Sequence, residues 1–125
     1  MRSPLESANT ILYCARWEET VSFYKEGLGL GVTFSTGWFV EFALTGSARL
    51  SIADARHATV RTGPEKGMTL SLEVDDLQAA WNALRDAGLV PGEIKSHAWN
   101  ARVFYLFDPE GHRLEFWQRC VPPHE

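Results

Sequence analysis

The sequence has few of the features that mark a nucleic-acid-binding or membrane protein. It contains no run of Lys or Arg, and its 12 basic against 16 acidic side chains give a formal net charge of −4. Because phosphate backbones are bound by basic stripes, nucleic acid is not expected as a partner. No apolar run approaches the roughly 20 residues that span a bilayer, and residues 1–6 lack the hydrophobic stretch of a signal peptide. We therefore expect a cytoplasmic protein with no membrane partner.

Cysteine is also scarce. The chain has two, Cys14 and Cys120, near its opposite ends. Neither has a second cysteine at the spacing of a zinc knuckle, so that kind of site is excluded. A disulfide would suit a secreted protein, which is not expected here. Cys14 is therefore interpreted as a small buried hydrophobic residue.

What the sequence does contain is one order of patterns that occurs twice. In the first half, alternation over residues 9–14 predicts a strand. A helical stripe follows from Trp17 to Leu28, and Gly27 and Gly29 end it. Further strands are predicted at residues 31–35, 38–44 and 49–53.

The second half restarts the same order after a charged segment. A strand is predicted at residues 69–74, and a helix over 77–87 has Asp76 as its N-cap and Gly88 after its end. Further strands are predicted at residues 93–97, 102–107 and 113–118. A type I turn at residues 108–111 closes the last hairpin.

Overlaying the halves supports an internal repeat. At an offset of 60 residues Leu12 meets Leu72, and at an offset of 64 Leu50 meets Leu114. We predict an α+β fold in which tandem βαβββ modules form a cupped mixed sheet with the helices on its outer face. The single domain over residues 1–125 then consists of modules at 8–53 and 69–118, a linker at 54–68 and a tail at 119–125.

Strand alternation predicts which side chains line this cup. Leu50, Ile52, Leu114 and Phe116 should face the helices. The opposite faces carry Asn9, Ile11, Tyr13, Arg49, Ser51 and Ala53 in the first half, and Thr69, Ser71, Glu73, Arg113, Glu115 and Trp117 in the second. With Gly111 as a bulge residue, Tyr105 lies opposite Glu115, and by the repeat Phe42 is expected opposite Ser51.

Two motifs make the sequence similar to a known family. Residues 9–13 (NTILY) running into residues 22–30 (SFYKEGLGL) resemble the opening of the vicinal oxygen chelate superfamily. Residues 107–117 (FDPEGHRLEFW) resemble the last hairpin of that superfamily, which includes glyoxalases, bleomycin-resistance proteins and extradiol dioxygenases. The resemblance covers residues 8–118 and implies the glyoxalase-like fold, but one scaffold hosts many activities.

The resemblance also implies where a metal ion would be bound. Metal enzymes of the superfamily place one ligand, usually His or Glu, on the first and on the last strand of each half. Carried over by motif, these positions are Asn9, Ser51, Thr69 and Glu115, of which only Glu115 is a good ligand. A divalent metal wants about three protein ligands of His, Cys or carboxylate type. We therefore expect no metal cofactor, and a divalent metal stays the alternative.

Other chemistry-bearing residues give weaker indications. His112 is interpreted as a solvated turn residue, and His97 as bordering the opening of the cup. Glu115 has two interpretations, a contact to a ligand or an ion pair with Arg113 or Arg49. The sequence has no nucleophile elbow and no glycine-rich phosphate loop before a helix, so the catalytic residues stay unassigned.

Aromatic residues carry the remaining signal, with five Trp, three Tyr and seven Phe. The candidate ligand-binding residues at or near the cup are Tyr13, Trp38, Phe42, Ser51, Trp99, Tyr105, Glu115 and Trp117. Such a cup suits an aromatic or cationic small molecule.

The first hypothesis is a small-molecule binding protein, and the resemblance implies a homodimer. The alternatives are a metal-dependent lyase, isomerase or dioxygenase that uses Glu115 as a ligand, and a non-catalytic dimerisation domain.

Overall fold

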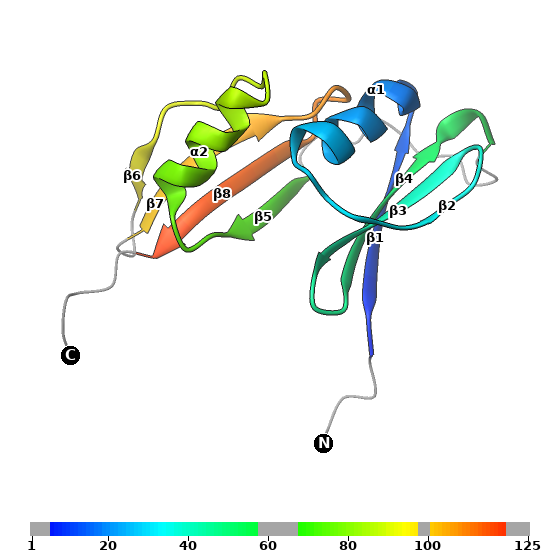
Figure 1. The fold of residues 1–125 in the computed structure, drawn as a ribbon, viewed down its shortest axis with the longest axis horizontal. Helices are drawn as coiled ribbons and strands as arrows, with labels where there is room; N and C mark the ends of the chain where they lie inside the picture. The colour runs from blue at the N-terminus through cyan, green and yellow to red at the C-terminus, as the bar shows by residue number, and fades with distance from the viewer. Residues whose placement is uncertain (1–5, 58–67, 98–100, 120–125) are drawn as a thin grey trace. The chain divides into compact units, whose positions relative to one another are not determined.

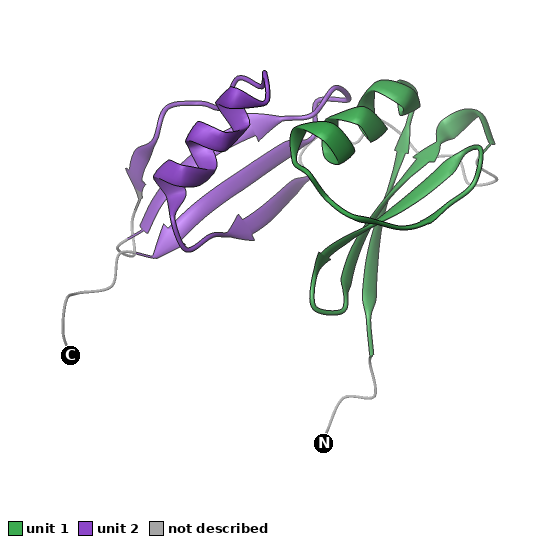
Figure 2. Ribbon diagram, viewed as in Figure 1, with its two compact units in different colours: residues 1–63 green, residues 64–125 purple. Residues whose placement is uncertain are grey.

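The computed structural model describes residues 6–57, 68–97 and 101–119, and the chain divides into two compact units, residues 1–63 and 64–125 (Figure 2). Each unit has the order strand, helix, three strands that the sequence predicts, so the α+β fold of tandem βαβββ modules is confirmed. No helix within the described residues is long and apolar enough to cross a bilayer. The cup expected between the sheets stays a prediction, and each unit is described by itself.

The first sheet has the strand order β1 (Ala8–Cys14), β4 (Ala48–Asp54), β3 (Phe39–Thr45) and β2 (Val32–Ser35), as Figure 1 shows. Strand β1 is parallel to β4, and the other neighbours are antiparallel. Strand β2, at the edge, is exposed along its whole length. A short 3-10 helix, η2 (Ala55–His57), follows β4 inside the segment that we expect as a linker.

The helix of the first unit begins as α1 (Trp17–Ser22) and continues as a π-helical turn, η1 (Phe23–Gly27). It contacts β1 and β4, and the fully buried side chain of Tyr24 lies 5.0 Å from the ring of Phe23 and 6.3 Å from that of Phe42. Burial of a large apolar side chain stabilises a fold by about 1.5–3 kcal/mol. The helix is therefore held to the sheet by packing.

The second sheet has the order β5 (Thr69–Glu73), β8 (Arg113–Arg119), β7 (Ala101–Phe107) and β6 (Lys95–His97) (Figure 1). Strand β5 is parallel to β8, which repeats the arrangement of the first sheet. Helix α2 (Leu77–Asp86) contacts β7 and β8. Leu77 and Leu84 of the helix are buried, and Phe104 stacks on Phe116 within the sheet at 5.0 Å.

Both ends of α2 follow from local sequence. At the start, the side chain of Asp76 accepts a hydrogen bond of 3.0 Å from the backbone N–H of Ala79, which confirms the predicted N-cap. At the end, Gly88 has φ of 88°, a left-handed conformation that a side chain would strain. The backbone N–H of Gly88 donates to the carbonyl of Arg85 and that of Leu89 to Leu84, so the last carbonyls are satisfied.

The turn between β7 and β8 also forms as predicted. The N–H of Gly111 donates to the carbonyl of Asp108 at 2.9 Å, and Gly111 has φ of 90°. The turn fixes the register in which Tyr105 lies opposite Glu115 and Phe107 opposite Arg113. His112, however, is buried, and its Nδ1 lies 2.8 Å from Oδ2 of Asp108. The expectation of a solvated His112 is wrong, because the carboxylate of the turn's first residue gives its ring a polar partner within the fold.

Candidate functional site

Each sheet has one face against its helix and one face that we call the open face. In the first unit Leu12, Cys14, Leu50 and Ile52 are buried on the helix side. Side chains alternate along a strand, so Asn9 and Ser51 belong to the open face of the first unit. In the second unit Leu114 and Phe116 are buried on the helix side in the same way. The open face of that unit then carries the residues of opposite parity on β5 and β8. The strand register pairs them as Thr69 with Arg113, Ser71 with Glu115, and Glu73 with Trp117.

The open face of the first unit carries a chain of hydrogen bonds across its strands. Ser51 Oγ, which is fully buried, donates to Asn9 Oδ1 at 2.8 Å. Asn9 Nδ2 donates to Glu41 Oε2 at 3.4 Å, and Thr33 Oγ1 donates to Glu41 Oε1 at 2.7 Å. Side chains from β4, β1, β3 and β2 are thus linked in the order Ser51, Asn9, Glu41, Thr33.

The open face of the second unit is built around Glu115. Its Oε1 accepts a hydrogen bond of 2.8 Å from Ser71 Oγ, and its Oε2 lies 3.5 Å from the hydroxyl of Tyr105, which donates to it. Arg113 Nε donates to Thr69 Oγ1 at 3.0 Å, and the Arg113 guanidinium carbon lies 4.8 Å from the ring centre of Tyr105. The open face therefore joins polar side chains of β5, β7 and β8.

Within the second unit, Glu115 does not form the ion pair with Arg113 that the sequence suggested. Arg113 is directed to Thr69 and Tyr105. Arg49 donates to backbone carbonyl oxygens of the hairpin that joins β3 to β4, those of Gly46 and Ala48. The carboxylate is satisfied by hydroxyl donors, and it keeps the capacity to accept further hydrogen bonds.

The register of β3 overturns one expected site residue. Glu41, not Phe42, lies opposite Ser51, and Phe42 lies opposite Leu50, fully buried against Tyr24. The placement of Phe42 on the open face is therefore wrong. The register shifts between Ala43 and Thr45 before the hairpin turn, and a shift of one residue moves every side chain to the other face.

Glu41 is the site residue that sequence reasoning missed. The offset of 64 residues that aligns Leu50 with Leu114 also aligns Glu41 with Tyr105, which lies opposite Glu115 as Glu41 lies opposite Ser51. Applied to β3, that offset would have found Glu41.

The other expected aromatic residues lie in different places. Tyr13 aligns with Ala53 across β1 and β4, and Trp117 is half-buried on the open face of the second unit with Arg119 at 5.4 Å from its ring. Trp99 lies outside the described residues, and the side chain of His97 is not described. Trp38 precedes β3 and stacks on His57, with 6.1 Å between the ring centres.

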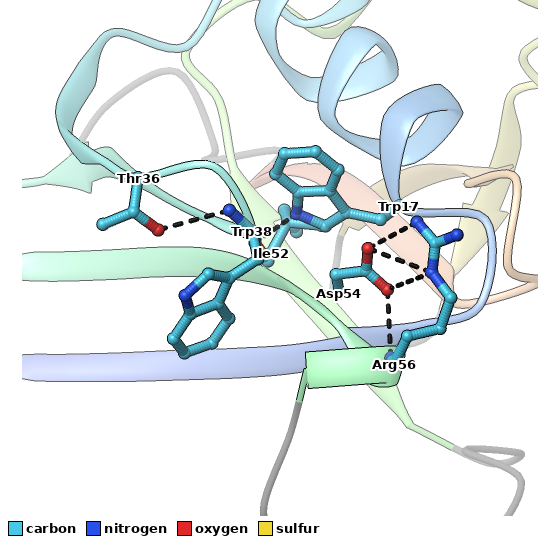
Figure 3. A network of polar contacts seen from close by, with 6 residues as sticks. All are labelled: Trp17, Thr36, Trp38, Ile52, Asp54 and Arg56. Atoms are coloured by element: carbon cyan, nitrogen blue, oxygen red, sulfur yellow. Dashed lines mark hydrogen bonds and ion pairs between the residues drawn. The ribbon is translucent and has the colours of Figure 1, made fainter.

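A polar network surrounds Trp38 at the end of the first sheet (Figure 3). The side chain of Thr36 accepts from the N–H of Trp38 at 3.3 Å, and the carbonyl of Trp38 accepts from the N–H of Asp54 at 2.8 Å. On the other side, the indole N–H of Trp17 donates to the carbonyl of Ile52 at 2.8 Å. These bonds tie the start of α1 and the start of β3 to the last residues of β4.

Asp54 and Arg56 form the strongest charged contact of this network (Figure 3). Arg56 Nη2 lies 2.6 Å from Asp54 Oδ2, and Arg56 Nε and its backbone N–H both donate to Asp54 Oδ1 at 3.0 Å. The hydrogen bonds from Arg56 lower the pKa of Asp54 to about 2, against the opposing effect of burial. In return, Asp54 raises the pKa of Arg56. Asp54 is therefore ionised near neutral pH and serves to fix the chain after β4.

The residues at the four implied ligand positions do not fit a metal ion. Ser51 and Asn9 are hydrogen-bonded to each other, Thr69 accepts from the cationic Arg113, and Glu115 is the only carboxylate among the four. Among the described residues, no three His, Cys, Asp or Glu side chains form a group that could hold a metal. Hydroxyl and amide oxygens without further carboxylates or imidazoles hold divalent metals poorly.

Comparisons with known proteins agree with this architecture. Three solved structures share the fold over most of their length. A glyoxalase/bleomycin resistance protein/dioxygenase from Nocardioides is 21% identical with a TM-score of 0.73, over 100% of this chain and 91% of that one. An antibiotic binding protein, TnmS3, from Streptomyces sp. CB03234 is 20% identical with a TM-score of 0.78, over 95% and 99% of the two chains. Lactoylglutathione lyase from Agrobacterium tumefaciens is 16% identical with a TM-score of 0.73, over 93% and 96%.

At these identities the structures show a common fold and no more. No curated protein sequence matches the chain. The family model described as Glyoxalase/Bleomycin resistance protein/Dioxygenase superfamily matches residues 7–116. This match covers nearly the whole chain and both βαβββ modules, so the protein belongs to the glyoxalase/bleomycin resistance protein/dioxygenase superfamily.

Proposed function

We propose that the protein binds a small aromatic molecule on the open sheet face of its second unit, without the help of a bound metal ion. The observation that carries the proposal is that the side chains at the implied metal-ligand positions are hydrogen-bonded to other protein groups. Ser51 and Asn9 satisfy each other at 2.8 Å, and Arg113 donates to Thr69 at 3.0 Å. A cation beside Thr69 opposes a second cation there by Coulomb repulsion.

The open face of the second unit offers what a ring-bearing ligand needs. Tyr105 and Trp117 supply flat apolar surface, and Glu115 and Ser71 supply polar groups that fix orientation. Binding sites for small molecules combine aromatic walls with a few such polar groups. One protein of similar fold, TnmS3, is an antibiotic binding protein, which gives the proposal a precedent on this scaffold.

Glu41 gives some support to a second candidate, a metal-dependent lyase or dioxygenase. It adds a carboxylate to the open face of the first unit, 3.4 Å from Asn9, one of the implied ligand positions. In this alternative Glu115 is a metal ligand, and activity requires a divalent ion. The two proposals predict different effects of metal removal: ligand binding persists in the first, and activity is lost in the second.

The test uses the full chain and three probes of one shape: 2-naphthoate, 2-naphthamide and 2-naphthylmethylammonium. The purified protein is dialysed against EDTA, its metal content is measured by mass spectrometry, and binding is followed by isothermal titration calorimetry. We expect at least one probe to bind with the same affinity before and after EDTA. Glu115→Gln should change that affinity without changing metal content, and the exposed Glu93→Gln is the matched control.

Two results contradict this proposal. One is the absence of binding by all three probes to the folded protein. The other is one tightly held metal ion per chain that disappears in Glu115→Gln and stays in Glu93→Gln, which would establish the metal-dependent alternative.

A further inference from the structure

The guanidinium of Arg113 is held in place on the open face of the second unit. Its Nε donates to Thr69 Oγ1 on β5 at 3.0 Å, and its carbon lies 4.8 Å from the ring centre of Tyr105 on β7. An arginine fixed from two sides loses little conformational entropy when it binds a further group. Among the described residues of the second unit, the Nη atoms of Arg113 form no hydrogen bond or ion pair, so they keep their donors for an incoming group.

The charge of Arg113 is also left without an acidic partner. Glu115, two residues along the same strand, is hydrogen-bonded to Ser71 and Tyr105. Among the described residues of the second unit, no carboxylate lies within ion-pair distance of Arg113. The side chain is exposed, so an incoming group reaches it from solvent.

Two aromatic rings of this face, those of Tyr105 and Trp117, already carry a cation, whereas Phe107, opposite Arg113, is an exposed ring without one among the described residues. Arg113 lies over Tyr105, and Arg119 lies over Trp117 at 5.4 Å while it contacts Glu73 at 3.7 Å. A cationic ligand would have to displace these guanidinium groups from the ring faces that attract cations. An anionic group instead meets the unpaired edge of Arg113, whose fork of N–H donors matches a carboxylate.

We propose that the open face of the second unit binds the anionic group of an aromatic ligand, a carboxylate or phenolate, through the Nη atoms of Arg113. Glu115 accepts a hydrogen bond from a hydroxyl or amide of the same ligand. The inference rests on the proposed function, and it narrows the proposed ligand class from aromatic to aromatic and anionic.

The experiment compares the three naphthalene probes, which share a ring system and differ in charge. Calorimetry with the full chain should give 2-naphthoate an affinity about tenfold higher than that of 2-naphthamide, since a hydrogen bond to a charged group contributes more than a neutral one. We expect 2-naphthylmethylammonium to bind more weakly than both. Arg113→Gln should remove the preference for the anion, and Arg113→Lys, which keeps the charge without the fork, should retain part of it.

The chain offers a matched control in Arg85. This residue also lies over an aromatic ring, 5.1 Å from the centre of Trp81, but on helix α2. Arg85→Gln removes the same charge and the same kind of stacking elsewhere in the unit, and it should leave the preference for 2-naphthoate unchanged.

The outcomes separate this inference from the proposed function. The anion site is overturned, while aromatic binding itself stands, if 2-naphthoate and 2-naphthamide bind with equal affinity or if the ammonium probe binds best. It is also overturned if Arg85→Gln loses the preference for 2-naphthoate as fully as Arg113→Gln does. Failure of all three probes to bind overturns both proposals. A tenfold preference that survives in folded Arg113→Gln shows that another group holds the anion, and the assignment to Arg113 is then wrong.

Discussion

Asp54 has a charge that the fold holds in place. Its side chain is almost fully buried at the end of β4, while that of Arg56 is 73% exposed. Arg56 lowers the pKa of Asp54 from 3.8 to about 2. A carboxyl group whose pKa is lower in the folded than in the unfolded state stabilises the fold above the unfolded pKa, and this contribution is lost as pH falls through the folded one.

Asp54→Asn should therefore make the free energy of unfolding less dependent on pH in the acidic range. The wild-type protein is expected to lose stability between about pH 4 and pH 2 more steeply than the variant, which has no carboxyl group to protonate at this position. Urea denaturation at a series of pH values measures the slope. Glu19→Gln is the control, because Glu19 is also paired with arginine but is 58% exposed, and solvent screens its charge. Parallel curves for the wild type and Asp54→Asn would contradict the prediction.

At the scale of elements, the two helices are stabilised in different ways. Helix α2 has a side-chain N-cap at Asp76 and a glycine at its end. Helix α1 has six residues, starts after Arg16 without a side-chain cap, and continues into a π-helical turn. A helix this short is not stable by itself in water, so α1 depends on packing of residues such as Tyr24 against its sheet.

The cap of α2 can be tested by replacing Asp76. Asp76→Ala removes the acceptor for the N–H of Ala79 and should lower the free energy of unfolding by about 1 kcal/mol. Asp76→Asn keeps an acceptor at the same place and should restore most of this loss. Asp75→Ala, one residue earlier, controls for the loss of negative charge before the helix. If Asp75→Ala costs as much as Asp76→Ala in urea denaturation, the hydrogen bond is not the cause.

At the scale of the whole molecule, the repeat places equivalent residues in two cores. Leu50 of β4 and Leu114 of β8 are both fully buried, and each strand pairs in parallel with the first strand of its unit. In the open faces the repeat keeps positions but changes chemistry, since Ser51 corresponds to Glu115 and Glu41 to Tyr105. The cores are thus alike while the candidate binding surfaces differ.

Because Leu50 and Leu114 are equally buried, their replacement is expected to lower the free energy of unfolding by similar amounts. Leu50→Ala and Leu114→Ala should each lower the free energy of unfolding by about 2–5 kcal/mol, because each removes buried methyl groups and leaves a cavity. Chemical denaturation measures the loss, and Val90→Ala, at a side chain that is 87% exposed, should cost little. A loss below about 1 kcal/mol at either leucine would mean that this position is not part of a packed core.

Local sequence determined the elements and much of the open faces. Alternation and helical periodicity predicted both βαβββ orders, Asp76 and Gly88 predicted the ends of α2, and residues 108–111 predicted the turn that sets Tyr105 opposite Glu115. These features depend on residues close together in the chain, and the period of a strand or a helix is visible in a single sequence.

Only the tertiary structure decided which side chains meet. It linked Ser51 to Asn9 and Asn9 to Glu41 by hydrogen bonds, and it buried His112 beside Asp108. It also brought Arg113 onto Tyr105, the contact on which the anion site rests. A one-residue shift at a bulge reverses the faces of a strand, and an arginine with several rotatable bonds reaches many partners, so pairing register and long-range packing selected contacts that local periodicity leaves open.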